Sequence, residues 1–138
     1  MSDVPILKDT DRSTGRGALQ KNIQAALALA GAVRSTLGPR GLDKLLIDDD
    51  GRTMVTNDGV TVLESAKVEH PVAKMIINAS SVQDKIARDG TTSTVLICAE
   101  MLQNAWHLVT QGVHPATIAR GFRMAEEHAR SELNALSF

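Results

Sequence analysis

The chain contains almost no aromatic residues, and this scarcity limits how its core can be built. Its 138 residues include one Trp, two Phe and no Tyr, although hydrophobic residues as a whole make up 43% of the sequence. A core of this composition must be filled by Ala, Val, Ile, Leu and Met, which suit closely packed helices better than two facing sheets. The composition therefore favours a mainly helical fold, and the length is sufficient for one compact domain.

The charge and the cysteine count exclude several classes of function. The formal net charge is −1 and there is no run of five Lys or Arg residues, so we do not expect nucleic acid as a partner. Cys98 is the single cysteine, which excludes an internal disulfide and a cysteine-based metal site. No segment approaches the roughly 20 apolar residues of a membrane span, and residues 1–16 show no signal-peptide pattern. These features predict a cytoplasmic protein without a membrane partner.

Apolar residues recur at steps of three and four along four segments, which predicts four long helices. Gly38-Pro39 ends the first, and Pro71 and Pro115 begin two others. A shorter helical stretch runs through residues 60–66. The residues that we expect to be buried are Leu19, Ile23, Ala26, Leu27, Ala30 and Val33 in the first helix, Val72, Met75, Ile76, Ala79, Val82 and Ile86 in the second, Val95, Ala99, Leu102, Trp106 and Val109 in the third, and Ile118, Phe122, Ala125, Ala129, Leu133 and Leu136 in the last.

Two short apolar runs surround a turn that ends in Asp50-Gly51, and this pattern predicts a β-hairpin over about residues 44–56. Residues 1–16 mix charge, Pro, Gly and Ser, which is typical of a flexible N-terminal arm. The predicted fold class is thus mainly α: a helical bundle of four long helices, one short helix and a small β-hairpin. We find no sign of a domain boundary within residues 17–138.

Three glycine-containing turns, residues 36–41, 56–59 and 89–93, are candidate sites for a phosphate group. The third has the most favourable chemistry, because the first amides of a helix lack internal acceptors and Gly90 allows a close approach. Asp89 beside these amides would repel a phosphate unless a cation such as Mg²⁺ lay between them. Taken singly, each turn is also ordinary turn or capping chemistry, and the sequence has no Walker A pattern.

The order of these segments strongly resembles that of chaperonins. The resemblance runs from about Ala18 to the C-terminus, and the Glu-His-Pro and Val-His-Pro stretches are similar to those of group II chaperonins (thermosome and eukaryotic cytosolic) or their bacterial relatives. The segments that carry it are residues 33–44, 56–63, 69–75, 89–92 and 112–115. The resemblance implies that residues 17–138 form the N-terminal half of the ATP-binding equatorial domain of an ATP-dependent protein-folding chaperone.

The resemblance also implies roles for individual residues. Asp89 matches the residue that binds Mg²⁺, and Asp58 matches a catalytic carboxylate that orients the attacking water near the γ-phosphate. ATP and Mg²⁺ are therefore the expected cofactors. The residues matched to nucleotide binding are Leu37, Gly38, Pro39, Gly90, Thr91 and Thr92.

Arg88 departs from the family pattern, in which a Gly precedes the metal-binding Asp. If this position has a positive φ, an Arg there is strained by on the order of 1 kcal/mol or more. The other interpretation is that the Arg88 side chain adds a cation beside the phosphates. Between the two, we expect some loss of function.

Chaperonin subunits are several times longer than this chain. We expect it to lack the client-binding apical domain, an acidic residue of the intermediate domain and the C-terminal half of the equatorial domain. Because these segments complete the active site of the family, the sequence leaves open whether this chain hydrolyses ATP. An alternative function is a truncated, nucleotide-independent interaction module that docks on full-length chaperonin subunits.

The resemblance implies that the partners are other chaperonin subunits, arranged in a ring, and unfolded client proteins. In such rings the hairpin joins the sheet of the neighbouring subunit. A local flap on its own domain is the alternative interpretation of the hairpin.

Overall fold

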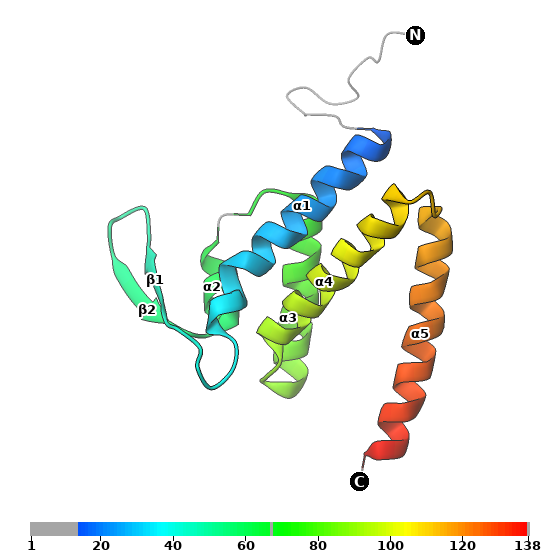
Figure 1. The fold of residues 1–138 in the computed structure, drawn as a ribbon. Coiled ribbons are helices and arrows are strands. Elements are labelled where there is room, and N and C mark those ends of the chain that lie inside the picture. Colours follow the sequence, from blue (N-terminus) through cyan, green and yellow to red (C-terminus); the bar gives the residue numbers. More distant parts are fainter. Residues whose placement is uncertain (1–13, 67, 138) are drawn as a thin grey trace. The chain divides into compact units, whose positions relative to one another are not determined.

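The computed structural model describes residues 14–66 and 68–137. Most of the predicted arm, residues 1–13, lies outside the described residues, while Gly15 and Arg16 belong to the first helix. For the described residues the predicted fold class is confirmed (Figure 1): four long helices, one short helix and a hairpin. The elements are α1 (Gly15–Val33), the 3₁₀ turn η1 (Arg34–Thr36), β1 (Lys44–Ile47), β2 (Thr53–Thr56), α2 (Gly59–Ser65), α3 (Pro71–Ala87), α4 (Thr91–Thr110) and α5 (Pro115–Leu136).

The chain divides into two compact parts, one up to Glu100 and one from Met101 onward. The first part contains α1 to α3, the hairpin and the first half of α4, and the second contains the rest of α4 and α5. Across the described ranges, none of the helices has the length and apolar character that crossing a membrane requires.

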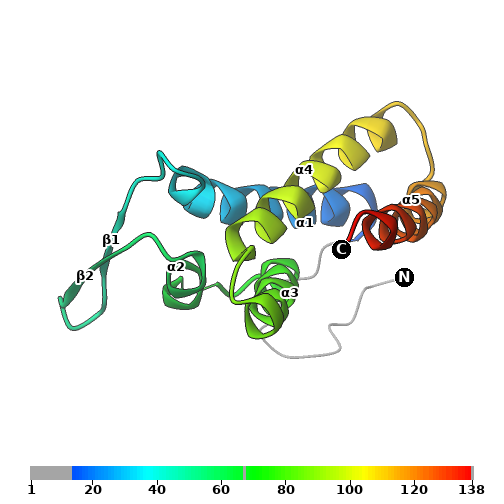
Figure 2. The ribbon, with the colours of Figure 1, turned by 90° about the horizontal axis from the view of Figure 1, so that it is seen from below.

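The core of the first part lies where α1, α2 and α3 pack against one another (Figure 2), and the first half of α4 adds two buried hydrophobic residues to it. None of its buried hydrophobic residues is aromatic, and several are Ala, so the expectation of a small aliphatic core is confirmed for the described residues. In α1, Leu29 is buried, and Leu27 of the predicted face is only half-buried. The core residues are Ile23, Ala26, Leu29, Ala30, Val33, Val62, Leu63, Ala73, Ile76, Val95 and Ala99.

The buried face of α3 differs from the predicted one. Its buried residues are Ala73, Ile76 and Ser80. Helix α3 packs against the Ala-rich face of α1, and helices that approach this closely place small side chains between them. The Ser80 hydroxyl is satisfied there, because it donates a hydrogen bond to the Ile77 carbonyl oxygen at 2.8 Å. The larger members of the predicted face are Met75, Val82 and Ile86, which are 69%, 53% and 80% exposed.

The predicted buried face of the last helix is wrong, because α5 has no buried residue. Leu133 and Leu136, both expected inside, are exposed. The second part of the chain consists only of the end of α4 and α5, and two helices without a further layer enclose little core.

Proline begins α3 and α5, as the sequence predicts. The residue before each proline is a histidine that caps its helix. His70 Nδ1 accepts a hydrogen bond from the Val72 amide at 3.3 Å, and His114 Nδ1 accepts one from the Ala116 amide at 3.1 Å. These histidines therefore have a structural role.

The predicted hairpin is confirmed. Strands β1 and β2 pair antiparallel, with Leu45 opposite Val55. In the turn, Asp48 Oδ1 accepts hydrogen bonds from the amides of Asp50 and Arg52, at 3.0 and 2.8 Å. Leu45 and Val55 are a cross-strand pair on one face, and both are largely exposed.

Candidate functional site

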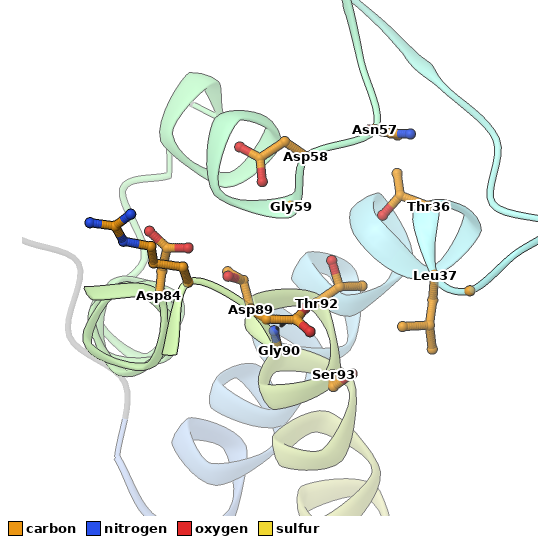
Figure 3. A pocket seen from close by; sticks show the side chains of 13 residues that line it. Thr36, Leu37, Asn57, Asp58, Gly59, Asp84, Asp89, Gly90, Thr92 and Ser93 are labelled. Atoms are coloured by element: carbon orange, nitrogen blue, oxygen red, sulfur yellow. Dashed lines mark hydrogen bonds between the residues drawn. The ribbon is translucent and has the colours of Figure 1, made fainter. Parts of the chain in front are cut away.

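Three segments of the first part surround one pocket of about 310 Å³ (Figure 3). They are the end of η1, the start of α2 and the turn between α3 and α4, which correspond to the three glycine-containing turns of the sequence. The volume lies at the lower end of the range for ligand pockets, roughly 300–1,000 Å³. The lining residues are Thr36, Leu37, Gly38, Asn57, Asp58, Gly59, Asp84, Arg88, Asp89, Gly90, Thr91, Thr92 and Ser93. Leu37 is the one large apolar residue among them, so the lining suits a polar or charged ligand.

The pocket brings together all of the predicted site residues except one. Pro39, which follows the pocket-lining Gly38, is not among the lining residues. Asp84 lines the pocket although no role was predicted for it. Its signal in the sequence is its place in the last turn of a helix that ends at a candidate site. The predicted residues that line the pocket are Leu37, Gly38, Asp58, Asp89, Gly90, Thr91 and Thr92.

The turn between α3 and α4 holds Asp89 at the start of α4. Arg88 ends α3 in the left-handed conformation, with φ 54° and ψ 27°, and its amide donates to the Asp84 carbonyl oxygen at 2.7 Å. Asp89 Oδ1 then accepts a hydrogen bond from the Gly90 amide at 2.6 Å. Gly90 has φ 83°, a conformation that glycine adopts without strain. The two residues with positive φ, Arg88 and Gly90, thus flank Asp89 and place its carboxylate directly before the start of α4.

The first turn of α4 offers free backbone donors to the pocket. The first hydrogen bond within this helix runs from the Thr94 amide to the Gly90 carbonyl oxygen, at 2.9 Å. The amides of Thr91, Thr92 and Ser93 precede it and have no acceptor inside the helix. All three residues line the pocket, where the positive end of the helix dipole favours a negatively charged group.

Asp58 begins α2 as its N-cap. Its Oδ2 accepts hydrogen bonds from the Thr61 hydroxyl at 2.6 Å and from the Thr61 amide at 2.9 Å. The bond from the Thr61 hydroxyl lowers the pKa of Asp58; partial burial opposes this shift, and the Thr61 and Val60 amides add to it. Asp58 is therefore a carboxylate at neutral pH.

Replacing Asp58 with Ala is expected to lower the free energy of unfolding by about 0.5–2 kcal/mol at pH 7, because the helix loses its cap. The pKa of Asp58 is lower in the folded chain than its ordinary value of about 3.9 in an unfolded chain. The stabilisation by the ionised form is therefore complete above about pH 4 and is lost as the pH falls through the folded pKa.

Urea denaturation at pH 7, 5 and 3 measures this dependence. The gap between wild type and Asp58→Ala should narrow at the lowest pH. An Asp58→Asn variant keeps an acceptor without the ionisable group, so its comparison with Asp58→Ala should change little with pH. A constant gap between wild type and Asp58→Ala at all three pH values would contradict the shift.

Gly59 lets the start of α2 approach the start of α4. It is buried, and a Cβ atom at this position would overlap the Thr92 side-chain oxygen. The close approach is what joins the second and third turns into one pocket. A side chain at position 59 would require the two helix starts to separate or the Thr92 side chain to turn away.

The η1 segment forms the third wall. Gly38 has φ 81° and lines the pocket, and the Gly41 amide donates to the Gly38 carbonyl oxygen at 2.9 Å. A Cβ atom at Gly41 would overlap the Thr36 carbonyl oxygen. The tight loop after η1 therefore requires a glycine at position 41, and it presents Gly38 and Leu37 to the pocket.

The charges around the pocket fit an anion that arrives with a cation. Asp58, Asp84 and Asp89 contribute three carboxylates, and Arg88 is the one cationic residue in the lining. A polyanion alone would be repelled at such a site. Within the described ranges there is no cluster of three His, Cys, Asp or Glu residues able to hold a metal ion. Mg²⁺ needs no such cluster when phosphate oxygens and water complete its coordination around one or two carboxylates. The donor set therefore fits Mg²⁺ shared with a phosphate group.

The sequence of this chain is similar to those of known proteins. The thermosome subunit beta of Thermoplasma acidophilum is 48% identical over 133 residues, which cover 96% of this chain and 24% of that protein. The thermosome subunit beta of Archaeoglobus fulgidus is 50% identical over 135 residues, which cover 97% of this chain and 25% of that protein. The chain thus spans about a quarter of the length of these curated relatives.

A solved structure of a group III chaperonin in the open state superposes with a TM-score of 0.77 and 35% sequence identity, covering 82% of this chain and 23% of that one. Residues 29–138 match the family model of the TCP-1/cpn60 chaperonins. The family match covers most of the chain and includes all three pocket segments. The chain therefore belongs to the TCP-1/cpn60 chaperonin family.

Proposed function

We propose that this chain is part of an ATP-dependent protein-folding chaperone subunit and supplies the phosphate- and Mg²⁺-binding half of its ATP site. The observation that carries this proposal is the pocket, in which the start of α4 and Asp89 lie beside two further glycine-containing turns. Membership of a chaperonin family supports the chaperone role. The similarity to thermosome subunits supports a group II assignment.

In this proposal the phosphates bind at the start of α4. The amides of Thr91 and Thr92 donate hydrogen bonds to the phosphate oxygens, and Gly90 allows their close approach. Asp89 holds Mg²⁺, which, when bound, neutralises part of the phosphate charge beside the three carboxylates. The lining amides and the Asp89 carboxylate support this division of roles.

The ribose and base lie toward the η1 side, in contact with Leu37, Gly38 and Pro39. A pocket of about 310 Å³ with a single large apolar residue is suited to the phosphates, and the nucleoside then extends beyond it. Pro39 does not line the pocket, but it directly follows Gly38, which does.

Asp58 orients the water that attacks the terminal phosphate. Its lowered pKa keeps it ionised at neutral pH, and Oδ1 is the oxygen that does not accept the Thr61 bonds. A carboxylate with one oxygen fixed by a helix cap has a defined orientation, which is what positioning a water requires.

Assembly with other chaperonin subunits uses the hairpin. Leu45, Ile47 and Val55 are exposed on it, at 62%, 67% and 64%, and a two-stranded sheet has unpaired outer edges. Addition of strands from a neighbouring subunit would cover both features. The same exposed hairpin favours the second candidate function, an interaction module that docks on full-length subunits without nucleotide. The two candidate functions differ in whether the chain binds ATP. In the main proposal, unfolded proteins are the clients of the assembled chaperone.

Removing Mg²⁺ tests the main proposal. Titration calorimetry measures the affinity of the chain for ATP in Mg²⁺ and in excess EDTA. The affinity should be at least about tenfold lower without the ion, because the attraction between two opposite unit charges at 4 Å is worth roughly 1–4 kcal/mol. Hydrolysis by the chain alone should be near zero. Equal binding in both buffers would contradict the Mg²⁺ part of the site, and the absence of binding in either buffer would favour the nucleotide-independent module.

A further inference from the structure

Arg88 adopts a backbone conformation that is unfavourable for it. Its φ of 54° is the one positive φ among the described non-glycine residues. The left-handed region costs a residue with a side chain about 1–2 kcal/mol, and the C-cap of a helix is a place where glycine is usual. A strained residue at a candidate site is a reason to ask what its side chain does.

The strain is not offset by contacts within the described chain. The Arg88 amide donates to the Asp84 carbonyl oxygen, but any residue except proline makes that bond. Among the described residues, the Arg88 guanidinium forms no ion pair with Asp84 or Asp89, although all three residues line the same pocket. The side chain is exposed, so packing does not hold it either. Its charged group is therefore available to a ligand.

The charges of the pocket lining indicate a role for the Arg88 guanidinium. A complex of Mg²⁺ with a triphosphate keeps a net negative charge, and it must approach three carboxylates. The helix dipole and the amides of α4 favour it, but they carry only partial charges. Arg88 is the one full positive charge in the lining, and a guanidinium can donate two parallel hydrogen bonds to phosphate oxygens.

We propose that Arg88 is a phosphate-binding residue of this pocket, whose guanidinium contacts the terminal phosphates of a Mg²⁺-bound triphosphate. The inference rests on the proposed function, because it names a further ligand-binding group at the same site. It predicts that the affinity for the Mg²⁺-bound phosphate ligand depends on the charge at position 88, whereas the stability of the fold depends on the backbone strain there. The two properties should therefore change independently in a set of variants.

Three variants distinguish the effect of the charge from the effect of the backbone strain. Arg88→Gln removes the charge and keeps an unbranched side chain with the same left-handed strain. Arg88→Lys keeps both the charge and the strain. Arg88→Gly removes both, since glycine adopts a positive φ freely. For each variant of the full chain, calorimetry measures the affinity for inorganic tripolyphosphate and for ATP in Mg²⁺, and thermal unfolding measures stability.

Arg88→Gln and Arg88→Gly should bind Mg²⁺-tripolyphosphate about tenfold more weakly than wild type, and Arg88→Lys should stay within about threefold. Arg88→Gly should unfold a few degrees higher than wild type, and Gln and Lys should not. Unchanged binding by Arg88→Gln, or a loss in Arg88→Lys equal to that in Gln, overturns this inference while Mg²⁺-dependent binding by wild type stands. Absence of Mg²⁺-dependent binding by wild type overturns the proposed function itself, and the inference with it.

Discussion

Replacing Asp89 with Ala is expected to weaken Mg²⁺-dependent ATP binding by about 10- to 100-fold or more. The carboxylate stands directly before the first amides of α4, with Oδ1 at 2.6 Å from the Gly90 nitrogen. Its removal takes away the proposed ligand of the divalent ion and leaves the phosphates without that bridge to the protein. Calorimetric titration of both proteins with ATP at saturating Mg²⁺ measures the difference.

Two controls separate the charge from the local structure. Asp89→Asn keeps an acceptor for the Gly90 amide, so the turn is preserved, but it lacks the charge that Mg²⁺ requires; it should lose most of the affinity. Asp50→Ala removes the same charge from the exposed hairpin turn, outside the pocket lining, and should bind like wild type. If Asp89→Ala and wild type bind equally well, Asp89 is not the metal-binding residue.

Replacing Gly59 with Ala is expected to destabilise the chain by about 1–3 kcal/mol and to disrupt the pocket. The added Cβ would overlap the side-chain oxygen of Thr92, so the starts of α2 and α4 must separate or Thr92 must turn away. Without this overlap the sign would be opposite, because Ala is a better helix former than Gly. Urea denaturation gives the free energy of unfolding.

Thr92→Ala provides the matched test of this contact. It removes the oxygen that the new Cβ meets, so the double variant Gly59→Ala/Thr92→Ala should recover stability to within about 1 kcal/mol of Thr92→Ala alone. Strict additivity of the two single changes would show that residues 59 and 92 do not interact. In that case α2 and α4 would not approach each other as described.

The positions of the helices were predictable from the sequence, but the buried faces of two of them were not. Apolar residues at steps of three and four, with Pro71 and Pro115 at helix starts, set the elements and their approximate ends. Such a pattern does not reveal which apolar residues a neighbouring element covers. On α3, Ile76 is buried and Ile86 is 80% exposed, because contact with α1 selects one narrow side of the helix.

The three turns of the site were visible in the sequence, and their order matched a known family, yet each alone was ordinary turn chemistry. Their convergence depends on tertiary contacts that no local pattern records, above all the approach of Gly59 to Thr92. Asp84 was missed because a carboxylate within a helix forms no motif of its own, and only its place in the last turn before a candidate site could have indicated it. The positive φ of Arg88 was expected only conditionally, and the structure has it.

The hairpin has both of its ends at the pocket. The chain leaves the lining at Gly38, forms β1 and β2, and returns to the lining at Asn57. The paired strands therefore connect two points of the pocket wall, with residues 39–43 between Gly38 and the start of β1. The hairpin, with its exposed apolar residues, is thus joined at both of its ends to the segments that would contact a ligand.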